Sequence, residues 1–273
     1  MIPYIGGKNN MAKWIAPYIP GDIETYVEVF GGAYWVYCKS DIHKKRDLKN
    51  IVYNDFNKHM ANLFYCLRNP DEIYKRVKDI EAQNENLFNQ YQKEVRETID
   101  FELGDYDLAV KYIYLATQVF SGSRIMTTGF IKLEPNKFDM FKRKISQWKY
   151  IEKLQKITHI ENIDYSEVIK KYDNEKTFFY VDPPYWKTED YYSNHEFDRE
   201  DHEKLCNQLK NIKGRFALSY YDFPLLKEWL PENKYNWERK AFAKKAAAKK
   251  GIKQNKGTEL LILNYPIKQL KLF

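Results

Sequence analysis

Phe178-Phe179-Tyr180-Val181-Asp182-Pro183-Pro184-Tyr185 is the stretch of this 273-residue sequence that says most about the fold. Its first four residues are all apolar or aromatic, which predicts a strand buried on both faces, as in a parallel sheet. In open α/β sheets, ligands bind beyond the carboxyl ends of the strands. The sequence therefore predicts a functional site at the four residues that follow this strand.

Similar short apolar runs occur on both sides of this stretch. They predict further strands at Tyr26–Phe30, Ile51–Asp55, Phe216–Tyr220 and Leu260–Tyr265, and a sixth at His159–Asp164. Helical patterns lie between several of these runs, for example over Asp198–Leu209. Alternating strands and helices favour an α/β fold with an open, mostly parallel sheet.

One long segment interrupts this alternation. Residues 61–155 contain helical patterns, with a break at Asn69-Pro70, and no convincing strand. We interpret the segment as a helical insertion between the second strand and the His159–Asp164 strand. Residues 1–60 and 156–273 then form one domain.

The composition is that of an ordinary soluble globular protein, with 44% hydrophobic and 30% charged residues. The three cysteines form no ligand or disulfide pattern, so a reduced, cytoplasmic setting is expected. The histidines show no metal-ligand spacing, and we expect no metal. No signal pattern begins the chain, and no apolar run approaches the ~20 residues that span a bilayer.

Positive charge is concentrated in two places, and the formal net charge is +7. Residues 71–105 hold ten acids and five basic residues, whereas residues 124–156 hold nine basic residues and three acids. The second basic stretch, 239–257, has eight Lys or Arg and no acid, and is interpreted as a long loop with a helical, alanine-rich start. Because duplex DNA is strongly anionic, the basic regions are expected to face it. The candidates are Lys142, Arg143, Lys144, Lys244 and Lys245.

The residues after the 178–181 strand suit chemistry on a planar amine. The exocyclic amine of adenine is a poor nucleophile, because its lone pair is delocalised into the ring. Asp182 and the Pro183 carbonyl can accept its two hydrogens, while Tyr185 can stack on the base. Pro183 and Pro184 fix the backbone and lack N–H donors, which favours a rigid acceptor site.

Two other segments predict a nucleoside cofactor. Glu28-Val29-Phe30-Gly31-Gly32 ends the first strand, and glycines let a backbone approach a ligand closely. Asp55 follows Gly32 by 23 residues, a spacing typical of a partner for ribose hydroxyls, which would also suit NAD. Near the N-terminus, Lys8 could bind the carboxylate of an amino-acid-like ligand, with Tyr4 packed against it.

The order of these motifs resembles that of the Dam-type DNA adenine methyltransferases: Tyr4 to Lys8 with GGK, then VEVFGG, then YND, then DPPY. The resemblance covers nearly the whole chain. It implies a Rossmann-like methyltransferase sheet, S-adenosyl-L-methionine as cofactor and an adenine in double-stranded DNA as target. It makes residues 61–155 a helical target-recognition insertion, and residues 1–60 and 156–273 the catalytic domain that binds S-adenosylmethionine. We expect direct methyl transfer to an adenine flipped out of the duplex, because its amine is inaccessible within the stack. We expect a monomer, encoded by a bacterium or phage.

The resemblance also assigns residues. It places Tyr4, Lys8, Asp55 and Asp182 around the cofactor, matches Glu28, Phe30, Gly31 and Gly32 to the first-strand turn, and matches Asp164 and Tyr165 to the segment beside the cofactor's adenine. Phe120, Ser121, Gly122 and Arg124 match the start of the DNA-contacting insertion, and Ser219-Tyr220-Tyr221-Asp222 matches a wall of the target pocket.

The sequence departs from the family at the glycine turn, where Phe30-Gly31-Gly32-Ala33-Tyr34 is one residue tighter and bulkier than Phe-x-Gly-x-Gly. Three other functions stay open: a cytosine-N4 methyltransferase, a catalytically inactive DNA-binding relative and an NAD-dependent oxidoreductase. The oxidoreductase leaves DPPY and the helical insertion unexplained.

Overall fold

The computed structural model describes residues 8–119, 125–147, 149–186, 197–243 and 256–267. These residues contain a seven-stranded sheet of order β3-β2-β1-β4-β5-β7-β6. Its strands are β1 (Thr25–Glu28), β2 (Asn50–Asn54), β3 (His159–Glu161), β4 (Thr177–Val181), β5 (Arg215–Tyr220), β6 (Asn236–Ala243) and β7 (Lys256–Leu263). The five strands β1 to β5 are parallel, whereas β7 runs antiparallel to both β5 and β6. The predicted Rossmann-like sheet is confirmed.

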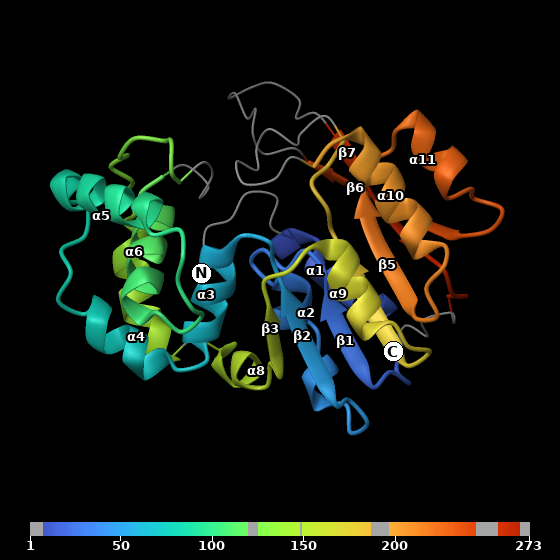
Figure 1. The fold of residues 1–273 in the computed structure, drawn as a ribbon, viewed down its shortest axis with the longest axis horizontal. Helices are drawn as coiled ribbons and strands as arrows, with labels where there is room; N and C mark the ends of the chain where they lie inside the picture. Colours follow the sequence, from blue (N-terminus) through green and yellow to red (C-terminus); the bar gives the residue numbers. More distant parts are fainter. Residues whose placement is uncertain (1–7, 120–124, 148, 187–196, 244–255, 268–273) are drawn as a thin grey trace.

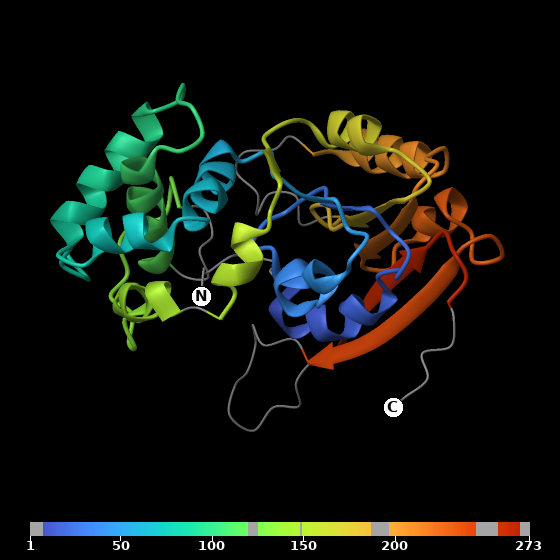
Figure 2. The same ribbon diagram turned by 90° about the horizontal axis from the view of Figure 1, so that it is seen from below.

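The sheet is covered on both faces. On one side lie α1 (Ala12–Ile15) and α2 (Trp35–Lys39), and on the other α9 (Tyr165–Tyr172), α10 (Arg199–Leu209) and α11 (Pro224–Trp229), as Figure 2 shows. Alternate residues of the central strands therefore enter two cores. Tyr26 of β1 belongs to the first core, and Val27 to the second. This double burial explains why the strands read as continuous apolar runs.

The helical segment lies beyond the β3 edge of the sheet (Figure 1). It comprises α3 (Lys58–Leu67), α4 (Pro70–Val77), α5 (Glu85–Glu97), α6 (Tyr106–Thr117), α7 (Lys137–Lys144), a 3-10 turn (Ile145–Gln147) and α8 (Ile151–Gln155). In the described part of residues 61–155 there is no strand, as predicted. The break at Asn69-Pro70 is also confirmed, because α3 ends at Leu67 and α4 begins at Pro70. Whether this segment recognises the target stays a prediction.

The interpretation of residues 239–257 as a long loop with a helical start was wrong over its described residues. Residues 239–243 belong to β6, and residues 256–257 begin β7. The two strands pair antiparallel, with Arg239 opposite Leu260 and Ala243 opposite Lys256. Alanine, arginine and lysine have high helix propensities, but propensity is a weak preference that tertiary contacts override, and pairing with the buried strand β7 outweighs it here. Residues 239–243 therefore belong to the edge strand of the sheet.

None of the helices within the described ranges is long and apolar enough to cross a membrane.

Candidate active site

The carboxyl ends of β1, β2 and β4 bring three predicted segments together. After β1 the chain forms β2 and β3, which lie to one side of β1 in the strand order, and then β4, which pairs with β1 on its other side. The β1–β4 boundary is thus a topological switch point, where open α/β sheets bind ligands. Backbone bonds fix the ends: Val29 N donates to Tyr180 O at 3.0 Å, and Gly31 N donates to Asn54 O at 2.7 Å.

The glycine turn after β1 is shaped by the end of β2. The ring of Tyr53 lies so close that a Cβ on Gly31 would stand 2.4 Å from it, so only glycine fits. Gly32 has a φ of +47°, in the left-handed region that favours glycine. The Tyr53 hydroxyl donates to Gly32 O at 2.9 Å. Tyr34, with a φ of +55°, takes the same region just before α2, which is how the bulkier turn is accommodated.

Asp55 holds this turn in place. Its Oδ2 accepts from Gly32 N at 2.8 Å, and its Oδ1 accepts from Asn57 N at 2.8 Å. Burial raises the pKa of Asp55 to about 6, although the two amide donors favour the carboxylate. Both carboxylate oxygens thus already have partners in the chain, and a ribose contact would use their remaining lone pairs.

Glu28 makes its described contacts within the chain, and its predicted contact with the cofactor stays a prediction. It is buried, and its Oε1 accepts from the Tyr26 hydroxyl at 2.6 Å and from Tyr37 N, in α2, at 2.7 Å. Burial raises its pKa to about 8, against the effect of both hydrogen bonds. Glu28 is therefore mainly protonated at neutral pH, and it ties β1 to α2.

Asp182 follows β4 directly and is largely buried, with Pro183, Pro184 and Tyr185 buried behind it. Its Oδ1 lies 3.1 Å from Lys8 Nζ. Burial raises the pKa of Asp182 to about 6; Lys8 lowers it, and a second carboxylate, Glu259, raises it.

Lys8 lies between these two carboxylates. Its Nζ is 2.8 Å from Glu259 Oε1, and it also donates to the Tyr185 hydroxyl. Burial alone would lower the pKa of Lys8, but Asp182 and Glu259 together raise it above its ordinary value. An ammonium group has three hydrogens, and three oxygens surround this one. Among the described residues, Lys8 thus neutralises two carboxylates of the chain; whether it also binds a ligand carboxylate stays a prediction.

An aromatic wall flanks the acidic centre. Phe30 stacks on Tyr165 with ring centroids 5.7 Å apart, and Tyr185 meets Tyr221 edge to face at 4.3 Å. Trp186 stacks on Phe223 at 5.0 Å. Such faces suit the planar rings of a nucleoside or a base.

Other predicted site residues are placed as follows. Asp164 is the N-cap of α9 and accepts from Ser166 N at 2.8 Å. Lys142 contacts Asp139 at 3.0 Å and donates to Ile80 O at 2.9 Å, whereas Arg143 and Lys144 are exposed at the end of α7. The remaining candidates lie outside the described residues: Tyr4, Phe120, Ser121, Gly122, Arg124, Lys244 and Lys245.

Sequence reasoning missed Glu259 in β7, which contacts both Lys8 and Tyr185. It also missed His202 of α10, whose Nδ1 contacts the buried Tyr220 hydroxyl. The sequence does mark Glu259 as unusual, because it is the first acidic residue after a long basic stretch and directly precedes an apolar run.

Comparison with known proteins agrees with this geometry. A family model described as D12 class N6 adenine-specific DNA methyltransferase matches residues 4–244. The chain is 25% identical to the Type II methyltransferase M.CviBI of Paramecium bursaria Chlorella virus NC1A, over 79% of this chain and 80% of the relative. It is 24% identical to the Type II methyltransferase M.MjaIII of Methanocaldococcus jannaschii, over 97% of this chain and 98% of the relative.

Proposed function

The chain belongs to the D12 class N6 adenine-specific DNA methyltransferase family, and we propose that it methylates the N6 amine of an adenine flipped out of duplex DNA, with S-adenosylmethionine as donor. The observation that carries this proposal is the position of the Asp182 carboxyl group, which follows β4 directly and lies beside the glycine turn at the switch point of the sheet.

The residues at this point fit the cofactor. Gly31 lets the backbone pass where no side chain fits, and the Phe30–Tyr165 stack offers an aromatic surface beside it. When bound, S-adenosylmethionine supplies a methyl group whose carbon leaves sulfur with the bonding pair staying on sulfur, and bonds to N6.

The residues of the chain orient the amine. Asp182 and the Pro183 carbonyl each accept one amine hydrogen, which directs the nitrogen lone pair away from the ring plane. As N6 gains a methyl group it becomes acidic, and the Asp182 carboxylate takes one proton from it and passes it to solvent. Orientation and preorganised charge supply most of the rate enhancement.

Asp182→Ala and Asp182→Asn test this role. We expect each to lower kcat at least about 100-fold, because a preorganised acceptor is lost, while DNA affinity without cofactor stays close to that of the wild type. Asp22→Asn is the matched control, since Asp22 also pairs with a cation, Arg215, at 2.6 Å, but lies on the surface.

Single-molecule sequencing of DNA from cells that express the wild-type chain reports the modified base and its sequence context together. N6-methyladenine supports the proposal, and its loss with Asp182→Ala assigns the residue. If the modified base is N4-methylcytosine, or if the Asp182 variants turn over at the wild-type rate, the proposal is wrong. An unmodified genome, with no S-adenosylmethionine bound in calorimetry, would instead indicate an inactive relative.

A further inference from the structure

Glu259 brings the last strand of the sheet into contact with the first residues of the described chain. Its Oε1 lies 2.8 Å from Lys8 Nζ and accepts from the Tyr185 hydroxyl at 2.5 Å. Lys8 in turn lies 3.1 Å from Asp182. A single carboxylate oxygen of β7 thus contacts both the lysine and the tyrosine that surround the Asp182 carboxylate.

The surroundings of Glu259 make this contact costly to maintain. The side chain is only 2% exposed, and Leu260–Leu263, which follow it in β7, are fully buried. A carboxylate taken out of water loses its hydration, so it needs close charged or hydrogen-bonding partners. Lys8 and Tyr185 are those partners. An apolar side chain would avoid the desolvation cost but could not hold either group.

Glu259 determines how the charge of Lys8 is shared between Asp182 and a second carboxylate. With Glu259 present, Lys8 is shared by two carboxylates, so only part of its charge acts on Asp182. Without the charge of Glu259, Lys8 would pair with Asp182 alone and compete with an amine hydrogen for that carboxylate. The Tyr185 hydroxyl would keep its contact with Asp182, but the carboxylate of Glu259 would be replaced by a neutral, weaker acceptor, which loosens the constraint on the ring.

We propose that Glu259 is a positioning residue for methyl transfer: it holds Lys8 and Tyr185 so that Asp182 can accept from the target amine and the Tyr185 ring keeps its orientation. The proposal rests on the proposed function. It does not require Glu259 to touch the cofactor or the DNA.

Glu259→Gln removes the charge and keeps the shape. We expect kcat to fall between about 10- and 100-fold, the size of effect that follows from slight misplacement of reacting groups. The affinity for S-adenosylmethionine, measured by calorimetry, should change less than about threefold, because the glycine turn is untouched. Glu238→Gln is the matched control: Glu238 lies in β6 of the same hairpin and also accepts from a tyrosine, Tyr18, at 3.2 Å.

A double-mutant cycle with Tyr185→Phe separates positioning from a general effect on folding. If Glu259 acts through the Tyr185 hydroxyl, the two substitutions together should lower kcat by less than the product of their separate effects. The same cycle in melting temperature should also be non-additive, and this second measurement needs neither cofactor nor DNA. If Glu259→Gln does not fold, Glu259→Asp, which keeps the charge but not the reach, replaces it in both cycles.

Glu259→Gln with a kcat within twofold of Glu238→Gln would overturn the proposal. Strictly multiplicative effects on kcat would overturn it too, since they show that Glu259 acts independently of Tyr185. If the wild-type chain methylates no DNA, the proposed function fails. The thermal cycle then still decides whether Glu259 and Tyr185 are coupled.

Discussion

Glu28 is a buried acid whose protonation should make the stability of the chain depend on pH. Burial raises its pKa to about 8, so the folded chain retains a proton that the unfolded chain releases near the ordinary value. The folded state therefore binds more protons over that window, and stability falls as pH rises from about 5 to 8, at up to about 1.4 kcal/mol per pH unit for this group.

Glu28→Gln should remove this contribution. The amide oxygen can accept from both Tyr26 and Tyr37, as Glu28 Oε1 does, and the amide group does not titrate. We expect the variant to match the wild type near pH 5 and to be more stable than it at pH 8, in urea unfolding at both values. Glu24→Gln is the control, because Glu24 pairs with Lys49 at the surface. Parallel pH profiles for wild type and Glu28→Gln would contradict this account.

At the scale of residues, the sequence was most informative where a polar group ends a buried strand. Asp55 and Asp182 were found in this way, because the carboxyl ends of parallel strands meet at one edge. Which partner each residue takes could not be predicted. Lys8 meets Asp182 and Glu259 across 174 and 251 residues of chain, and no local pattern specifies such contacts. The partners of Glu28 are near in sequence, Tyr26 and Tyr37, but its place beside the glycine turn suggested a ligand contact instead.

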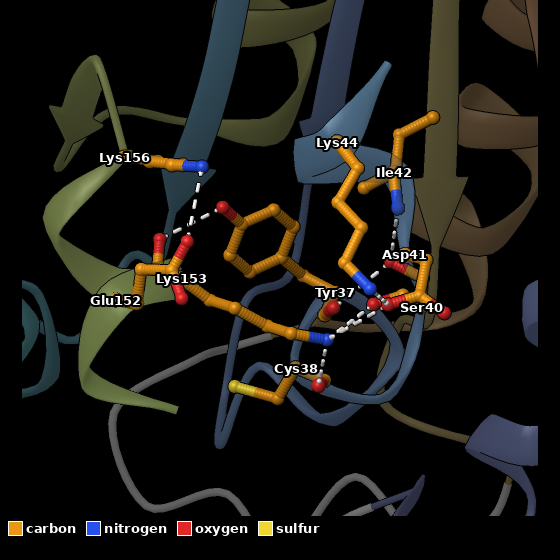
Figure 3. A network of polar contacts seen from close by, with 9 residues as sticks. All are labelled: Tyr37, Cys38, Ser40, Asp41, Ile42, Lys44, Glu152, Lys153 and Lys156. Carbon is orange, nitrogen blue, oxygen red and sulfur yellow. Dashed lines mark hydrogen bonds and ion pairs between the residues drawn. The ribbon is translucent and has the colours of Figure 1, made fainter. Parts of the chain in front are cut away.

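At the scale of elements, α2 is held at both ends. Glu28 accepts from Tyr37 N in the helix, and Lys153 of α8 donates to the carbonyls that end it (Figure 3). Lys153 Nζ lies 2.9 Å from Cys38 O, and it also contacts Ser40 O. A cation at the C-terminus of a helix satisfies its last carbonyls and opposes its dipole. Through α2, the helical segment thus reaches the strand that ends in the glycine turn.

Lys153→Met should therefore destabilise the chain by about 1–2 kcal/mol, because a largely buried cation with two carbonyl acceptors is lost. Lys156→Met is the matched control, three residues further along the chain at the end of α8. Lys156 pairs only with Glu152, at 3.3 Å on the surface of α8, and its removal should cost less than about 0.5 kcal/mol (Figure 3). Urea unfolding of both variants gives the comparison. Equal losses would mean that Lys153 does not cap α2.

The elements themselves were predictable where one residue pattern dominated. Asp198–Leu209 formed α10 with Asp198 as its cap, and the six predicted strands all formed, with shifted ends. The missed element, β6, mixes Trp237, Phe242 and charged residues without a clean alternation. It forms because its backbone pairs with β7, which is a contact between strands and not a property of either one.

At the scale of the whole molecule, the strand order decides where the site lies. The sequence predicts a parallel sheet but not the order of its strands. The structure shows that β4 lies beside β1. The largest core runs from Tyr26 in the sheet to Phe88 and Tyr114 in the helical segment, so the two parts share a hydrophobic interior. If DNA binds the helical segment, this shared core would hold it in a fixed position relative to Asp182.

If the basic half of the helical segment faces DNA, the exposed Arg143 and Lys144 at the end of α7 should contact phosphates. Replacing both by Gln should then weaken binding to all duplexes alike and reduce the salt dependence of log K by up to about 2, since each phosphate contact contributes about 0.9. Lys75→Gln with Lys93→Gln, exposed in the acidic half, is the matched control. Fluorescence anisotropy with a labelled duplex across a salt series measures the slope. An unchanged slope for the α7 pair would place the DNA on another surface. An equal change in the control would also contradict the prediction, because the loss of two charges alone would then explain the result.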